Sequence, residues 1–210
     1  MHGENKLYIL HDEILQDVVV EDDVQWHLTR EGEPGKLTFT VVGGLGTILE
    51  EGDQVQFYWD GFKIFLGFLF SHTLTPDGKY QCVAYDQLRY LKNQDTIVFK
   101  DSNAYTTFRL IADTFGVKLG VILDPGYNFN MVEDNVSGLD MVKDYCDQIL
   151  INTEKMYVMY DDFGQIMFKD IERDMGLQYL LNQNNSEDYT YTISIDDNTY
   201  NKVKLGQLFL

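Results

Sequence analysis

Alternation of apolar and polar side chains dominates residues 18–100 and predicts strands that are buried on one face. The pattern occurs three times before residue 60, and a turn signal at 33–35 and a glycine-rich loop at 43–46 separate the repeats. The apolar positions of the three predicted strands are Val24, Trp26 and Leu28, then Leu37, Phe39 and Val41, then Val55, Phe57 and Trp59.

Two hairpin turns extend this β-rich region. Asp60-Gly61 is typical of a tight two-residue turn, and residues 75–78 predict a second hairpin. The strand between them, residues 62–70, is apolar on both faces except at Lys63 and Gly67, so we expect one face to meet another subunit or domain. Short strands at regular spacing predict a small barrel or sandwich, which we assign to residues 1–100.

The chain then changes to a helical period. Ser102 or Asn103 can cap a first helix that ends at Gly116, and Ser137 with Asp140 indicates the start of a second. The predicted buried positions are Ala104, Phe108, Ile111, Ala112 and Phe115 in the first helix, and Leu139, Val142, Cys146, Ile149 and Leu150 in the second. This pattern places Cys146 in a core.

A β-hairpin follows, with strands at 156–160 and 165–171 around a turn at 161–164. Residues 101–181 therefore read as an α/β domain. A polar linker and new alternating strands, at 189–195 and 200–205, indicate that a new β segment begins within residues 182–210. These strands complete the first barrel, pair with another chain, or belong to a longer protein of which this chain is a piece. The predicted fold class is α+β, mainly β.

Composition limits the possible functions. The 210 residues include 44% hydrophobic side chains, enough for a sizeable core, and carry a net charge of −18. Such a surface repels nucleic-acid phosphate, so specific nucleic-acid binding is not expected. The charge fits either simple solubility or a wall past which a polyanion slides. A polar N-terminal segment and the absence of any long apolar run indicate a cytosolic protein that binds no membrane.

Residues that carry chemistry are scattered. The four histidines, at positions 2, 11, 27 and 72, show no metal-ligand spacing, and the two cysteines, Cys82 and Cys146, lie in apolar patterns and are expected to be inert. The acidic pairs at 22–23, 161–162 and 196–197 lack the rest of a calcium loop, and turn formation explains the second pair better. The sequence therefore predicts no catalytic, cofactor-binding or metal-binding residue, no cofactor, and no enzymatic activity.

One block of sequence is specific enough to indicate a family. Residues 84–96, AYDQLRYLKNQDT, resemble the XkdQ/YqbQ-type hub proteins of PBSX-like prophages. Residues 34–41, 51–53 and 155–164 are similar to further blocks of that family in the same order. In this resemblance the stretch 85–91 ends a strand and enters a short helical piece, with Leu88, Tyr90 and Leu91 plugging a barrel end. An ordinary strand exit with a solvated Asp86 and Arg89 fits the residue types equally well.

The resemblance implies a fold similar to the late-control gpD hub and the VgrG base, with two barrels flanking an α/β unit. On this resemblance, residues 182–210 are expected to form a linker and the first strands of the second barrel. It also implies a structural baseplate hub subunit of a contractile phage or phage-derived bacteriocin tail. The implied partners are two further copies in a homotrimer, the tail tube and spike proteins, and the tape-measure protein. The implied location is the bacterial cytoplasm during assembly and then the baseplate of the particle. The alternative is a cell-wall hydrolase or glycan-binding module of a tail.

Overall fold

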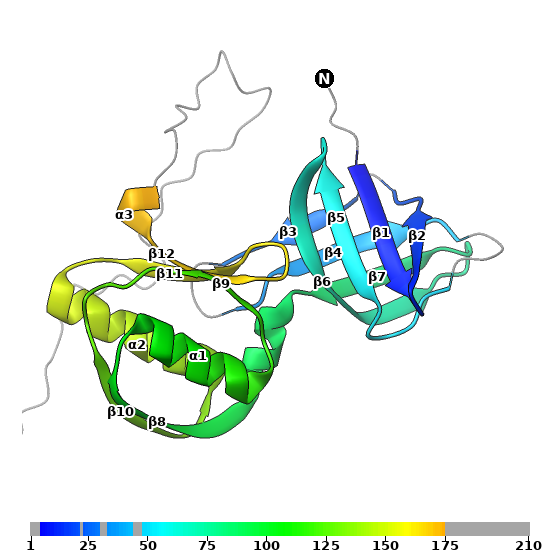
Figure 1. Ribbon diagram of the computed structural model, residues 1–210. Coiled ribbons are helices and arrows are strands. Elements are labelled where there is room, and N and C mark those ends of the chain that lie inside the picture. The colour runs from blue at the N-terminus through cyan, green and yellow to red at the C-terminus, as the bar shows by residue number, and fades with distance from the viewer. Residues whose placement is uncertain (1–4, 22, 30–32, 44–47, 175–210) are drawn as a thin grey trace, which may run out of the picture. The chain divides into compact units, whose positions relative to one another are not determined.

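A computed structural model describes residues 5–21, 23–29, 33–43 and 48–174 (Figure 1). The first part of the chain forms one antiparallel sheet in the order β2-β1-β5-β6-β7-β4-β3. Its strands are β1 (Asn5–His11), β2 (Ile14–Val18), β3 (Gln25–His27), β4 (Lys36–Val41), β5 (Gln54–Trp59), β6 (Phe62–Leu74) and β7 (Tyr80–Tyr85).

The two ends of this sheet approach each other without a full strand pairing between them. A single antiparallel bridge joins Val20, just after β2, to Val41 of β4, and Glu21 N donates to Thr40 O at 2.9 Å. The concave side encloses an apolar core, whose fully or nearly fully buried members include Leu7, Ile9, Leu37, Phe39, Val41, Val55, Phe57, Phe65 and Leu69. The predicted barrel is thus a curved sheet in which one bridge connects the segment after β2 to β4, the strand next to the last.

The N-terminal hairpin corrects the sequence interpretation, which placed the first strand after residue 17. Leu7 and Ile9 of β1 are 1% and 0% exposed and lie in the centre of the core. By contrast, Trp26 and Leu28 are 42% and 45% exposed, although their alternation predicted burial. The reason is position: β3 is the last strand of the sheet order and pairs only with β4, so no neighbouring strand covers its outer side.

The β5–β6 hairpin confirms the Asp60-Gly61 signal. Both turn residues have positive φ, 50° and 79°, and Trp59 pairs with Phe62 on either side. Along β6 the buried residues alternate with half-buried ones, so Leu66, Phe68 and Phe70 lie on the outer face. That face was expected to meet another subunit or domain, and it does contact later segments of the chain: Phe68 and Phe70 have ring contacts with Tyr90.

A prediction for stability arises at Gly67, which faces the core of this sheet. A Cβ added there would lie 2.3 Å from the carbonyl oxygen of Tyr85 and 2.5 Å from the ring of Phe65. Because backbone cannot move aside cheaply, we expect Gly67→Ala to lower the free energy of unfolding by about 2 kcal/mol. Urea unfolding measures this, with the exposed Ser71→Ala on the same strand as control; equal stability of the two variants would contradict the close approach.

The second part of the chain is a three-layer α/β arrangement (Figure 1). Two helices pack between a two-stranded ribbon, β10-β8, and a three-stranded sheet, β11-β12-β9, in which β12 is parallel to β9. The elements are the 3-10 helix η1 (Gln87–Lys92), β8 (Gln94–Ser102), α1 (Ala104–Phe115), β9 (Leu119–Ile122), β10 (Phe129–Ser137), α2 (Gly138–Thr153), β11 (Tyr157–Asp161), β12 (Ile166–Asp170) and α3 (Ile171–Asp174).

Aromatic side chains fill the centre of this second core. The Phe168 ring lies 4.6 Å from that of Phe108 and 5.0 Å from that of Tyr157, measured between ring centroids. Tyr145 is fully buried beside them, and its hydroxyl donates to the carbonyl of Tyr127 at 3.0 Å. Burial of rings on this scale is the main stabilising contribution to the layers.

The predicted helix ends are confirmed. Asn103 caps α1 by accepting a hydrogen bond from Thr106 N, Gly116 ends it at φ 69°, and Ser137 accepts from Asp140 N at the start of α2. The predicted stripe of α2 is partly wrong. Cys146 is only half-buried and Leu150 is 43% exposed, because Met141 and Tyr145 turn toward the core in their place.

The short helix η1 corrects another expectation. Leu88 and Leu91 are buried in the second core, with α2, and do not plug the end of the first sheet; Tyr90 lies against the outer face of that sheet. The α+β, mainly β fold class is confirmed. The division at residues 100 and 181 stays a prediction, and the strands expected within 182–210 lie outside the described residues. None of the helices described is both long and apolar enough to span a membrane.

Candidate functional site

The buried Asp86 and Gln87 and the half-buried Asp161 form a polar cluster, here called the carboxyl junction, where the first sheet leads into the α/β layers. Asp86 follows β7 and caps η1, Gln87 opens η1, and Asp161 ends β11. Asp86 and Gln87 are 2% and 7% exposed. Burial of polar side chains at this level requires hydrogen-bond partners, and each of the three has them.

Asp86 binds two backbone groups from different segments. Its Oδ2 accepts a hydrogen bond from Gly35 N at 2.8 Å and its Oδ1 accepts one from Leu88 N at 3.0 Å. The packing leaves no room for a side chain at position 35, since a Cβ on Gly35 would lie 2.5 Å from Asp86 Oδ2. Burial, and then the negative charge of Asp161, raise the pKa of Asp86 to about 7, although the two backbone N–H groups act in the opposite direction.

Gln87 connects Asp161 to the segment before β9. Its Nε2 donates to Asp161 Oδ2 at 2.7 Å, and its Oε1 accepts from Lys118 N at 2.8 Å. The other oxygen of Asp161 accepts from Gly164 N at 2.8 Å, which closes the turn of the β11–β12 hairpin. Burial is the main cause that raises the pKa of Asp161 as well.

The arrangement serves to hold the chain together. Every carboxylate oxygen of Asp86 and Asp161 accepts a hydrogen bond from the protein itself. The carboxyl junction therefore joins the residue before β4, the start of η1, the segment before β9 and the β11–β12 turn. The interpretation of Asp86 as a solvated residue is wrong, because contacts distant in sequence bury it; the turn role predicted for Asp161 is confirmed.

The histidines at positions 11, 27 and 72 do not come together. His11 Nδ1 lies 2.9 Å from Asp53 Oδ1, and this hydrogen bond is the largest cause that raises the pKa of His11. His72 lies 3.3 Å from Glu51 at another point of the sheet, and His27 is exposed as expected. His2 lies outside the described residues. Nowhere in the described ranges do three or more His, Cys, Asp or Glu side chains form a group able to hold a metal ion.

The cysteines occupy different environments. Cys82 is buried, and burial raises the pKa of its thiol to about 12, so the reactive thiolate is scarce near neutral pH. Cys146 borders an apolar groove of about 280 Å³ between α2 and β11, which is lined by Leu139, Val142, Lys143, Cys146, Asp147, Leu150 and residues 156–159. Of the other acidic pairs, Asp23 accepts from Thr40 Oγ1, and residues 22 and 196–197 lie outside the described residues.

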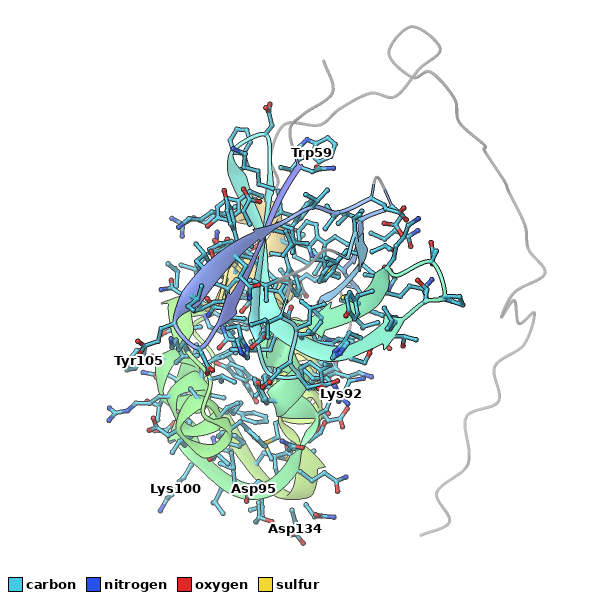
Figure 2. The ribbon with its side chains drawn as sticks, turned by 90° about the vertical axis from the view of Figure 1, so that its right-hand side faces the viewer. Trp59, Lys92, Asp95, Lys100, Tyr105 and Asp134 are labelled. Atoms are coloured by element: carbon cyan, nitrogen blue, oxygen red, sulfur yellow. The ribbon has the colours of Figure 1, made fainter. Side chains whose placement is uncertain are left out.

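Exposed hydrophobic side chains are the second notable feature. One of them is Trp59, and the prediction that it lies on the buried face of its strand is wrong. Trp59 and Phe62 flank the β5–β6 turn and are 46% and 69% exposed; Figure 2 shows Trp59 at the far end of the sheet. On the β8–β10 ribbon, Val98 pairs with Val132, and both are more than half exposed. Asp95, Lys100 and Asp134 project from the same ribbon in Figure 2.

Comparisons with known proteins agree with the fold. The profile of the YQBQ-like family matches residues 24–207. YqbQ of Bacillus subtilis is 30% identical over 196 residues, covering 89% of this chain and 59% of its own length. The phage-like element PBSX protein XkdQ of the same organism is 27% identical over 201 residues. The match covers 91% of this chain and 61% of XkdQ. The chain thus spans about three-fifths of these two relatives.

Among solved structures, the 43 kDa tail protein of prophage MuSo2 from Shewanella oneidensis superposes with a TM-score of 0.59 at 11% identity. The superposition covers 78% of this chain and 54% of the tail protein, and at that identity it shows a shared fold. The family profile extends from β3 through the whole α/β part and includes the carboxyl junction. On this match the chain belongs to the YQBQ-like family.

Proposed function

We propose that this chain is a structural subunit of the baseplate hub of a contractile phage-like tail, where it connects the tail tube to the central spike. The observation that carries the proposal is the family match over residues 24–207, supported by the fold shared with a prophage tail protein. Exposed aromatic side chains such as Trp59 and Phe62 support a role in protein assembly, since interfaces are rich in such residues.

A structural role fits what the buried acids do. In the proposed function, Asp86 and Asp161 shape the subunit and carry out no reaction, and the protein works without a cofactor. The partners in this proposal are two further copies of the subunit, the tube, the spike and the tape-measure protein. The net charge of −18 supports a surface that a passing polyanion does not bind.

Removal of the gene from a strain that produces the particle tests the proposal. We expect particles without a spike-bearing baseplate, seen by electron microscopy, and their recovery when the gene is supplied from a plasmid. A plasmid with a stop codon early in the gene is the matched control. Normal spike-bearing baseplates in the deletion strain would overturn the proposal.

A second measurement separates assembly from cell-wall chemistry. The purified protein, incubated with peptidoglycan, is expected to release no muropeptides, and light scattering behind a sizing column is expected to show a trimer when the spike partner is present. Muropeptide release would overturn the structural assignment, and a monomer that ignores both tube and spike proteins would overturn the partner assignment.

A further inference from the structure

The turn between β11 and β12 has a residue that conflicts with its backbone conformation. Asp162 and Gln165 exchange two backbone hydrogen bonds, of 2.8 and 3.3 Å, around Phe163 and Gly164. Both central residues have positive φ, 50° and 86°. A turn of this type favours Asn-Gly or Asp-Gly, because a bulky side chain is strained at positive φ. The requirements of the turn therefore do not explain the phenylalanine at this position.

The β5–β6 turn gives a direct comparison within the same molecule. It also has two central residues, and both have positive φ, 50° at Asp60 and 79° at Gly61. There the first residue is aspartate, which such turns favour. The two turns differ in what they touch, since a Cβ added at Gly61 would meet nothing within 4 Å, whereas one at Gly164 would lie 2.9 Å from Leu66 Cδ2.

Phe163 contacts the outer face of the seven-stranded sheet. Its ring centroid lies 5.4 Å from that of Tyr58, with an interplanar angle of 62°, and the Lys63 ammonium lies 4.9 Å above the ring. Tyr58 belongs to β5, and Lys63 belongs to β6, as does Leu66, which the turn backbone touches. The tip of one hairpin is thus seated on a different sheet.

The free-energy cost of the Phe163 backbone conformation and the free energy gained from its ring contacts are of similar size. A non-glycine residue at positive φ costs about 1–2 kcal/mol. An edge-to-face ring pair contributes about 0.5–1.5 kcal/mol and an exposed cation–π contact about 0.5–1 kcal/mol. A binding partner can therefore shift the equilibrium between the docked and the open hairpin. Two states a few kcal/mol apart respond to a modest difference in the partner's affinity for them.

We propose that the contact of Phe163 with Tyr58 and Lys63, here called the latch, holds the β11–β12 hairpin on the outer face of β5 and β6. When the latch opens, the chain pivots at Asp86. Asp86 is the point where β7 ends and η1 begins, and Leu88 and Leu91 fix η1 in the second core. Opening separates Phe163 from Tyr58 and Tyr90 from Phe68, while both apolar cores stay intact. This inference goes beyond the proposed function and does not depend on it.

The variant Phe163→Asn distinguishes a side chain that anchors the hairpin on the sheet from one that serves only the turn. Asparagine favours positive φ, so the hairpin itself is relieved of strain while the ring is lost. If Phe163 served only the turn, this variant would keep the docked arrangement. Asp60→Asn is the control, because it places the same residue at the same position of the β5–β6 turn, where a Cβ added at Gly61 would meet nothing within 4 Å.

Distances between two spin labels report the state of the latch. The 210-residue chain, with Cys82→Ala and Cys146→Ala, carries labels at the exposed positions of Thr73 on β6 and Thr114 on α1. Double electron–electron resonance is expected to show one dominant distance in the parent protein and in Asp60→Asn. For Phe163→Asn we expect loss of that single maximum, with a thermal unfolding midpoint that stays within about 4 °C of the parent.

A second variant covers the case in which Phe163→Asn fails to fold. Leu66→Ser removes part of the surface that receives the turn and leaves the turn residues unchanged. Loss of the dominant distance in either folded variant supports the latch. An unchanged distance in Leu66→Ser and in any folded Phe163→Asn, or an equal change in Asp60→Asn, overturns it.

Discussion

Asp86→Ala is expected to lower the free energy of unfolding by about 3 kcal/mol at pH 5, because it leaves two buried N–H groups without an acceptor. The donors are Gly35 N and Leu88 N, which now bind the two oxygens of one carboxyl group. The loss affects two places at once, since Gly35 precedes β4 and Leu88 lies in η1. Urea unfolding followed by circular dichroism measures it.

Asp162→Ala is the matched control for this prediction. It removes a carboxyl group of the same kind from an exposed position beside the carboxyl junction, and we expect it to change stability by less than about 0.5 kcal/mol. If Asp86→Ala is no less stable than Asp162→Ala at pH 5, the two hydrogen bonds to Asp86 contribute nothing to the fold.

Local signals in the sequence predicted local structure well. Asn103 and Gly116 delimit α1 because a cap side chain and a positive φ act within a few residues of the helix end. Asp60-Gly61 defines its hairpin for the same reason, since the turn needs only the conformations of two residues. In each case the decisive interaction lies within about four residues of the signal.

Features that depend on distant contacts were not predictable in this way. The pairing of β1 with β5 joins residues some fifty positions apart, and the β8–β10 ribbon forms across α1 and β9. Asp86 looked like a solvated strand exit because the groups that act on it include Gly35 N, which donates a hydrogen bond, and the negative charge of Asp161. Neither residue is a neighbour in sequence. Family resemblance pointed to the 84–96 block but not to what Asp86 does there.

Cys146 illustrates the same limit on a helix. A period of 3.6 residues places it on the apolar stripe of α2, yet which side of that stripe is covered depends on how β11 and η1 pack against the helix. Met141 and Tyr145 face the centre of the core, so Cys146 is left at the edge of the groove. Amphipathicity predicts a buried face and not its exact width.

Stability is expected to fall as the pH rises from about 4 to 7, because Asp86 keeps its proton in the folded protein and loses it in the unfolded chain. Its pKa is about 7 in the folded protein, against the ordinary value of 3.8 for an aspartate side chain. Between these values the folded state binds one more proton, so each rise of one pH unit lowers the free energy of unfolding by about 1.4 kcal/mol. The stabilisation is fully present below pH 4 and is lost as the pH rises through 7.

Asp86→Asn isolates this contribution from that of the other acids. Burial also raises the pKa of Asp161, Glu133 and Asp144, and these groups act in the same direction in both proteins. An amide does not titrate, so the stability difference between parent and Asp86→Asn should shrink by up to about 4 kcal/mol from pH 4 to 7.5. Chemical unfolding at several pH values gives this difference directly. A constant difference would mean that Asp86 is ionised throughout, held as an anion by the N–H groups of Gly35 and Leu88 despite its burial.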